Sequence, residues 1–325
     1  MSSGSHNPVL AGNKALVIGI ANEHSIAYGC AKAFSEQGAE VAITYLNDKA
    51  RPYVEPLARE LGAELFMPLD VSIPGQLEAV FGQIQQTWGR LDILVHSIAF
   101  APKDDLQGRL VDCSAEGFLI AMDVSCHSFI RMARLAVPLM AEGGTMFAMS
   151  FHGAQKVVEG YNLMGPVKAA LEASCRYLAS ELGPQGIRVH AISPGPLQTR
   201  AASGLKGFDQ LLDEAAQRAP LGELVDILDV GGLCAYLASP DARRITGGTF
   251  YIDGGVNIMA CYFWALRTFR TTEWPVTSYD LIGCSGTMPN RPRNQKAVQR
   301  DFPAYVLQAI HRRRCRLKSP AAASV

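Results

Sequence analysis

Short apolar runs alternate with longer helical segments from Lys14 to Asp253, and this rhythm determines the class of fold. The predicted strands cover residues 15–21, 39–45, 63–70, 91–98, 145–151, 187–193 and 249–253. The predicted helices cover residues 25–38, 49–62, 74–89 and much of 115–140. Because the strand runs are apolar throughout rather than alternating, both faces of each strand should be buried. Strands joined by helices require βαβ crossovers, so we predict an α/β domain with a doubly wound parallel sheet.

The rhythm stops near Ala260, and the charge changes sign at the same place. Residues 261–325 contain 11 Lys or Arg and 3 Asp or Glu, a net charge of +8. Residues 1–260 contain 19 and 27, a net charge of −8, so the neutrality of the whole chain is a cancellation. We therefore predict one domain over residues 12–260 and a basic, disordered extension over residues 261–325. The alternative for its terminal HRRRCRLK cluster is a patch for nucleic acid or anionic lipid.

Composition and cysteine spacing indicate the broad class of protein. Apolar residues make up 48% of the chain and charged residues 18%, which is enough apolar surface for a large core. The eight cysteines form no CxxC pair, which favours buried thiols in a reducing cytosol over a disulfide framework. No secretory signal pattern is visible, and no uncharged apolar run reaches the roughly 18–20 residues of a membrane span. We expect a cytoplasmic protein with no membrane partner.

The segment that joins the first strand to the first helix has the features of a phosphate-binding turn. Gly19 ends the strand, where a glycine allows a tight turn and lets the backbone approach a pyrophosphate. The helix that begins near Ser25 directs free N–H groups and a positive dipole end at the same place. Ser25 is expected to cap that helix or to donate to a phosphate. Because Gly19 and Gly29 are ten residues apart, GxGxxG is absent, and the turn indicates a nucleotide site only in its context.

The carboxyl ends of the later strands add polar groups along the same edge of this Rossmann-like sheet. After the second strand, Asp48 comes a little late to hold the ribose of NAD, and Lys49 and Arg51 suit a 2′-phosphate. The choice between NADH and NADPH is therefore open. Asp70 ends the third strand, where a carboxylate accepts from an adenine amino group or from a helix N-terminus. Residues 96–99 end the fourth strand at the same ligand-binding edge.

Tyr161 and Lys168 follow the fifth strand and have the chemistry that carbonyl reduction requires. Hydride transfer from a nicotinamide leaves negative charge on an oxygen, which needs a positioned acid. A tyrosine with a pKa near 10 takes that role when a nearby ammonium favours its charged form. Seven residues apart, the two would share a helix face at about 10.5 Å along the axis, although Pro166 belongs in a first turn or a kink. The pair alone is uninformative, but beside a nucleotide turn it indicates a reductase.

In their order along the chain, these motifs resemble those of bacterial enoyl-acyl-carrier-protein reductases, divergent members of the short-chain dehydrogenase/reductase superfamily. The matching motifs are Gly19-x5-Ser25-Ile26-Ala27-x-Gly29, HSIAFAP at 96–102, Tyr161-x2-Met164-x3-Lys168, SPGPLQTRAASG at 193–204 and DGG at 253–255. Ordinary members of the superfamily carry TGxxxGxG, NNAG and Tyr-x3-Lys instead. The resemblance covers residues 12 to 260, so it implies a single Rossmann-like domain followed by a tail that is not part of the family.

The resemblance implies an activity and a set of site residues. The implied reaction is the NADH-dependent reduction of the trans-2-enoyl double bond of a fatty acyl-carrier-protein thioester in fatty acid biosynthesis, with NADPH as the alternative cofactor. Tyr161 would stabilise the enolate oxygen formed when hydride adds to the β-carbon, and Lys168 would hold the nicotinamide ribose. The implied cofactor-binding residues are Gly19, Ser25, Ile26, Asp70, Val71, Ile98, Lys168, Leu197, Thr199 and Ala201. The implied substrate-binding residues are Ala101, Phe151 and Met164, together with a mobile segment at 199–212.

Two positions depart from the family pattern. The family carries a second tyrosine ten residues before the catalytic one, and here that position is Phe151, which keeps the ring and loses the hydroxyl. At the second strand Leu46 replaces a glutamine, which removes a polar contact near the adenosine. The altered polar groups beside Tyr161 leave 3-oxoacyl-acyl-carrier-protein reduction as the alternative activity, because there hydride and acid act on the two atoms of one ketone. The other interpretation of Phe151 is a tolerated substitution.

Two other classes of function compete with the reductase. The first is a nucleotide-binding scaffold without catalysis, against which the presence of both Tyr161 and Lys168 argues. The second is a binding role for the basic extension, which predicts a salt-dependent association with nucleic acid or lipid. We favour the reductase, with an acyl-carrier-protein thioester as partner, no nucleic acid and no metal. The resemblance also implies a homotetramer.

Overall fold

The computed structural model describes residues 8–197, 199 and 208–259, without the side chains of residues 208–211. The predictions for Ala201, for residues 200–207 of the mobile segment and for the extension 261–325 lie outside the described residues.

A parallel sheet of seven strands forms the centre of the described chain, in the order β3-β2-β1-β4-β5-β6-β7. Its strands are β1 (Lys14–Ile18), β2 (Glu40–Tyr45), β3 (Leu65–Pro68), β4 (Ile93–His96), β5 (Gly144–Met149), β6 (Ile187–Pro194) and β7 (Thr249–Ile252). Ala15 of β1 lies between Val41 of β2 and Ile93 of β4. The strand order therefore reverses at β1 and β4, and ligands of open α/β sheets bind at such a point. The predicted doubly wound parallel sheet is confirmed.

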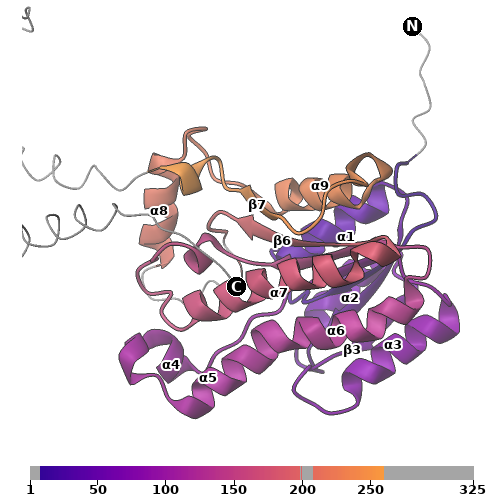
Figure 1. Ribbon diagram of the computed structural model, residues 1–325, viewed down its shortest axis with the longest axis horizontal. Helices are drawn as coiled ribbons and strands as arrows, with labels where there is room; N and C mark the ends of the chain where they lie inside the picture. The colour runs from indigo at the N-terminus through magenta and orange to yellow at the C-terminus, as the bar shows by residue number, and fades with distance from the viewer. Residues whose placement is uncertain (1–7, 198, 200–207, 260–325) are drawn as a thin grey trace, which may run out of the picture. The chain divides into compact units, whose positions relative to one another are not determined.

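Helices cover both faces of this sheet (Figure 1). On one face α1 (Ile26–Glu36), α2 (Arg51–Glu60) and α9 (Ile227–Ala238) contribute to one apolar cluster. On the other face α3 (Gln76–Thr87), α5 (Ala115–Met122), α6 (Ser128–Ala136) and α7 (Met164–Leu182) contribute to a second cluster. The helices α4 (Lys103–Gln107) and α8 (Phe208–Arg218) lie in connections near the carboxyl edge. Apolar cores on both faces explain why the strand runs show no alternation.

The predicted helix within 115–140 is interrupted in the structure. A π-helical turn, Asp123–His127, separates α5 from α6. The sequence interpretation names no helix at α4, α8 or α9. Helix α9 carries Gly231 and Gly232 in its interior. Each glycine there lowers helix stability by about 1 kcal/mol relative to alanine, so the local sequence does not predict this helix. A capping box between Asp226 and Asp229 starts it.

Cysteine placement agrees with the expectation of buried thiols. Within the described part of the chain, Cys30, Cys126, Cys175 and Cys234 are buried and Cys113 is half-buried, and all five are free. No helix among the described residues is long and apolar enough to cross a bilayer.

Helices α1 and α9 pack with their backbones in direct contact because glycines face each other. A Cβ built on Gly29 would lie 2.1 Å from the carbonyl oxygen of Ile227. A Cβ on Gly231 would lie 2.3 Å from the carbonyl oxygen of Gly29. Since α1 follows the turn after β1, this contact fixes the helix whose N-terminus faces the carboxyl edge of the sheet.

Replacing Gly29 with Ala is expected to lower the free energy of unfolding by about 3 kcal/mol, because the added methyl must push two packed backbones apart. Chemical denaturation of the full chain measures the change. The matched control is Gly82→Ala in α3, where a Cβ meets no atom within 4 Å, so higher helix propensity should stabilise the fold by about 0.5–1 kcal/mol. Equal stability of the Gly29→Ala and wild-type proteins would contradict the proposed close packing.

Candidate active site

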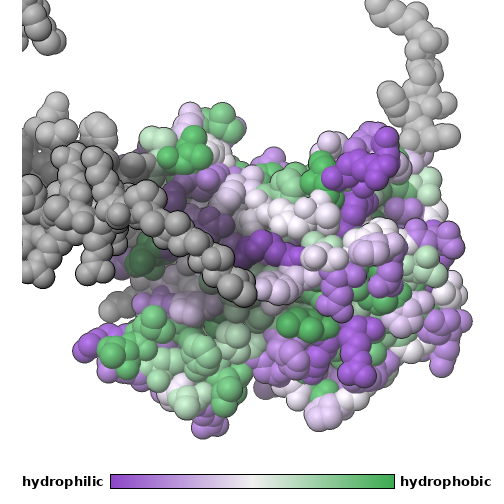
Figure 2. Space-filling model, in the orientation of Figure 1, coloured by the Kyte–Doolittle hydropathy of each residue, from purple (hydrophilic) through white to green (hydrophobic). Residues whose placement is uncertain are grey.

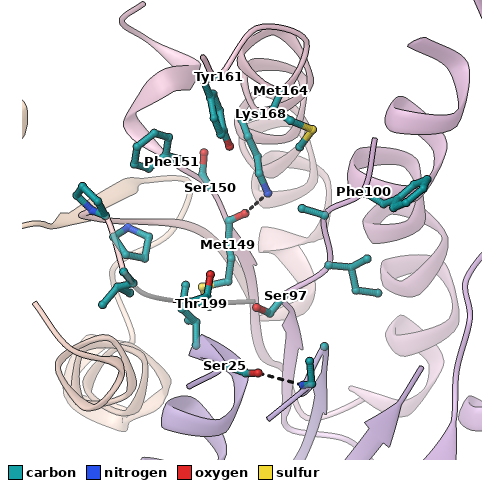
Figure 3. Close-up of a pocket in the computed structure, with 18 of the residues that line it drawn as sticks. Ser25, Ser97, Phe100, Met149, Ser150, Phe151, Tyr161, Met164, Lys168 and Thr199 are labelled. Carbon is teal, nitrogen blue, oxygen red and sulfur yellow. Dashed lines mark hydrogen bonds between the residues drawn. The ribbon is translucent and has the colours of Figure 1, made fainter. Parts of the chain in front are cut away.

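A cavity of about 370 Å³ opens at the carboxyl ends of the central strands (Figure 3). Its walls come from the segments after β1, β4, β5 and β6 and from the start of α7. Its size falls in the range of small-molecule and cofactor sites. It brings together eleven of the predicted site residues: Gly19, Ser25, Ile26, Ile98, Ala101, Phe151, Tyr161, Met164, Lys168, Leu197 and Thr199.

Two of the predicted cofactor residues do not line this cavity. Asp70 follows β3, and its carboxylate accepts hydrogen bonds from the backbone N–H of Ser72 at 2.9 Å and from the Ser72 hydroxyl at 2.5 Å. The structure therefore shows Asp70 as the carboxylate of a local turn. Val71 is buried, and its carbonyl accepts from Arg131 at 3.0 Å. Contact of either residue with a cofactor stays a prediction.

The turn after β1 is held in shape by its own side chains. Gly19 has φ +110°, and a Cβ there would lie 2.1 Å from the carbonyl oxygen of Ser97 after β4. Only glycine fits, both for its φ and for the close approach. The Ser25 hydroxyl accepts hydrogen bonds from the N–H groups of Ala21 at 3.0 Å and Asn22 at 3.1 Å. Ser25 occupies the N-cap position of α1, as predicted, but its hydroxyl makes no capping hydrogen bond to that helix.

Tyr161 and Lys168 line the same cavity but do not share a helix face. Tyr161 lies in the turn before α7, which begins at Met164, and Asn162 in that turn has φ +38°. The prediction of one shared helix is wrong because Pro166 occupies the first turn of α7, the place where a helix tolerates proline. Figure 3 shows the two side chains directed from this region toward the end of β5. There the Lys168 ammonium donates to the carbonyl oxygen of Met149 at 2.6 Å.

Burial governs the protonation of these two groups. Desolvation lowers the pKa of Lys168 to about 8, and the thiols of Cys126 and Cys175 and the carboxylate of Glu172 oppose that shift. Desolvation, and after it the charge of Glu172, raises the pKa of Tyr161 above its ordinary value. The expectation that the ammonium favours the charged form of the tyrosine is therefore wrong. The raised pKa keeps the proton on the Tyr161 hydroxyl near pH 7, so this group is able to donate a hydrogen bond.

A further buried titratable group lies beneath the cavity. Burial, followed by the nearby Lys168, lowers the pKa of His96 to about 3, so its imidazole is neutral. Its Nε2 lies 2.7 Å from the hydroxyl of Ser128, which donates to the carbonyl of Val124. Among the described residues that line the cavity, Lys168 is thus a cation below pH 8.

Several lining residues escaped the sequence interpretation. Ser97 and Phe100 follow β4 within the motif HSIAFAP, and both line the cavity. Leu106 comes from α4, which no pattern predicts. Met149 ends β5 and Ser150 follows it, and the hydrogen bond from Lys168 to the carbonyl of Met149 shows the importance of this strand end. The ring of Phe151 meets the edge of Tyr161 with ring centres 4.9 Å apart.

Comparison with known proteins assigns the chain to a family. The profile of the family described as enoyl-(acyl carrier protein) reductase matches residues 19–257. The enoyl-acyl-carrier-protein reductase (NADH) 2 of Rhizobium meliloti is 43% identical over 252 residues, which cover 78% of this chain and 94% of the relative. The reductase FabI of Escherichia coli is 41% identical over 252 residues, 77% of this chain and 96% of the relative.

This chain belongs to the enoyl-(acyl carrier protein) reductase family.

Solved structures of family members share its fold. The reductase of Anaplasma phagocytophilum, described as a complex with NAD, is 45% identical with a TM-score of 0.74, covering 77% of this chain and 96% of that one. The Aquifex aeolicus reductase is 43% identical with a TM-score of 0.74, covering 77% and 99%. The resemblance seen in the sequence motifs is thereby confirmed. Within the family pattern, Phe151 retains the ring contact with Tyr161 although it lacks the hydroxyl.

Proposed function

We propose that this chain catalyses the NADH-dependent reduction of the trans-2 double bond of enoyl thioesters on acyl carrier protein, a step of fatty acid biosynthesis. The observation that carries the proposal is the convergence of the β1 turn, Tyr161 and Lys168 on one cavity at the point where the strand order reverses. Curated relatives from seven bacterial strains or species are named as NADH-dependent enoyl-acyl-carrier-protein reductases, two of them from Rhizobium meliloti. Those names support NADH, and they give no support to 3-oxoacyl reduction.

The residues of the cavity fit a nicotinamide dinucleotide. At one end, the turn from Gly19 to Ser25 precedes the N-terminus of α1, which suits a pyrophosphate. At the other end the buried ammonium of Lys168 suits the hydroxyls of the nicotinamide ribose. Ile98, Leu197 and Thr199 line the walls between these ends. When bound, this cofactor supplies the hydride.

The chain's own residues supply the rest of the chemistry. Negative charge develops on the thioester oxygen when the β-carbon is reduced, and the Tyr161 hydroxyl stabilises it with a hydrogen bond. Because Tyr161 is 8% exposed, this bond forms away from bulk water, where it is strongest. The Lys168 ammonium keeps the local potential positive. Ala101, Phe151 and Met164 would contact the acyl group, and the last two flank Tyr161 in Figure 3.

The activity is tested with purified full-length chain, crotonyl and acetoacetyl thioesters, and NADH or NADPH. We expect oxidation of NADH with crotonyl thioester and a rate on acetoacetyl thioester that is lower by at least tenfold. Consumption of cofactor with the ketone alone would establish 3-oxoacyl reduction instead. Cofactor binding without turnover of any acyl thioester would establish the scaffold interpretation.

The same proposal includes three further expectations, on the domain bounds, on location and assembly, and on the adenosine side of the cofactor. The family match at 19–257 supports a reductase domain over residues 12–260. A cytoplasmic homotetramer is the form that the resemblance implies, and light scattering of the purified chain measures its assembly. Asp70, Val71 and Ala201 are proposed to meet the adenosine and pyrophosphate side of the cofactor.

The pH profile of the reaction follows from Lys168. A cation with a pKa lowered to about 8 is charged below that pH and neutral above it. We expect kcat/KM to be flat between pH 6.5 and 7.5 and to fall about tenfold per unit above pH 8, because kcat/KM reports groups of the free enzyme. The raised pKa of Tyr161 places its own titration above this range. A profile that stays flat to pH 9.5 would contradict the assignment.

A further inference from the structure

Glu172 is a buried carboxylate one turn beyond Lys168 on α7. It is 2% exposed, and both of its oxygens accept hydrogen bonds. The Ser150 hydroxyl donates to Oε1 at 2.7 Å, and the side-chain amide of Gln155 donates to Oε2 at 3.1 Å. A carboxylate accepts through both of its oxygens, so it suits these two donors. Burying such a charge is costly unless it is paired, so its position beside the cavity requires an explanation.

The two donors bracket the loop that carries Phe151. Ser150 begins this loop directly after β5, and Gln155 follows its short 3₁₀ turn. The ring of Phe151 packs against Tyr161, and a Cβ on Gly153 would lie 2.6 Å from that same tyrosine ring. Glu172 therefore holds both ends of the segment against which Tyr161 rests.

Lys168 and Glu172 act on neighbouring residues of the same strand end. Lys168 donates to the carbonyl of Met149, and Glu172 accepts from the hydroxyl of Ser150. Two successive turns of α7 thus bind two successive residues at the end of β5, one through a cation and one through an anion. Displacement of either turn would move Tyr161 relative to the cavity.

Glu172 is also the carboxylate that acts on the Lys168 ammonium. The other titratable groups facing Lys168 are the thiols of Cys126 and Cys175 and the imidazole of His96. Burial raises the pKa values of both thiols and lowers that of the imidazole, so these three groups are neutral near pH 7. Three titratable groups lie around Glu172 itself. They are Tyr161 in the turn before α7, Tyr251 on β7 and His152 in the 3₁₀ turn after β5.

We propose that Glu172 is a positioning residue for the reaction, which holds the loop of Phe151 through Ser150 and Gln155 and balances the charge of Lys168. The inference rests on the proposed function for the role of Lys168. In this role Glu172 does not touch the substrate and acts through Ser150, Gln155 and Lys168.

The decisive variant is Glu172→Gln in the full-length chain, because glutamine keeps the volume and removes the charge. Its amide oxygen can still accept from one of the two donors, whereas its NH2 group cannot accept from the other. Without that charge the ammonium loses a stabilising partner, so the alkaline limb of kcat/KM should move to lower pH by at least half a unit.

The second variant, Glu172→Asp, keeps the charge and shortens the side chain by one methylene. Its limb should stay where it is in the wild type, while kcat falls at least fivefold because the loop contacts are lost.

Glu181→Gln, an exposed substitution on the same helix, is the matched control and should leave the profile unchanged. A limb within 0.2 units of wild type in Glu172→Gln would overturn the charge role, and wild-type kcat in Glu172→Asp would overturn the loop role. NADH affinity as a function of pH, measured by fluorescence, should show the same shift without turnover. This binding readout separates failure of the inference from failure of the proposed reaction, which the wild-type thioester assay alone decides.

Discussion

Replacing Tyr161 with Phe should lower kcat for reduction of crotonyl thioester by about 10²–10³-fold, the usual effect of removing one donor to a developing oxyanion. The reason is that the lost hydroxyl is the donor placed in the buried part of the cavity. Affinity for NADH should stay within twofold, since the ring remains packed against Phe151. Steady-state kinetics and cofactor titration measure the two effects separately.

The control for this variant is Tyr177→Phe, which removes a hydroxyl from a 79% exposed tyrosine on α7. Its kinetics should match those of the wild type. If Tyr161→Phe retained more than a third of the wild-type kcat, the oxygen of the substrate would have to be stabilised by another group.

Replacing Lys168 with Met should raise the dissociation constant of NADH about 10- to 100-fold, because a hydrogen bond to a charged group contributes about 1.5–3 kcal/mol. Methionine fills the space of the buried stem, so the change isolates the ammonium. The alkaline limb near pH 8 should disappear from the residual activity, since the group that titrates is gone. Isothermal titration with NADH and a pH series of kcat/KM measure both effects.

Lys32→Met on α1 is the matched control, because this lysine lies partly exposed in an ion pair with Glu60. It should bind NADH as the wild type does. Unchanged affinity in Lys168→Met would show that the cofactor is held elsewhere along the cavity. A limb that persists near pH 8 would assign the titration to another group.

The exposed apolar side chains show which part of the surface the fold leaves uncovered. In Figure 2 hydrophobic side chains gather over α4 and α5, next to polar ones over α3 and α6. Phe118 and Leu119 of α5 are 39% and 67% exposed, which is unusual for neighbouring large apolar residues. Phe118 and Leu119 therefore belong to an apolar face that the described part of the chain leaves uncovered.

Much of the architecture could be predicted from the sequence because its signals are local. All seven predicted strands are present, since continuous apolar runs such as 15–21 suit only strands covered on both faces. The turn after β1 could also be predicted, because Gly19 and Ser25 determine the backbone conformation within a few residues of themselves. Helix α9 could not be predicted, because its interior glycines gain their meaning only from the backbone of α1 against them.

The chemistry of the site divides in the same way. By itself the sequence determined the residue types: a tyrosine and a lysine in a family motif, beside a turn for a phosphate. Only the tertiary structure decided that Tyr161 precedes its helix, that burial lowers the pKa of Lys168 to about 8, and that Glu172 lies behind both. The physical reason is that desolvation and charge act through space. Glu172 comes 17 residues after Gln155 and 22 after Ser150, and the three side chains become one network only when α7 packs on the end of β5.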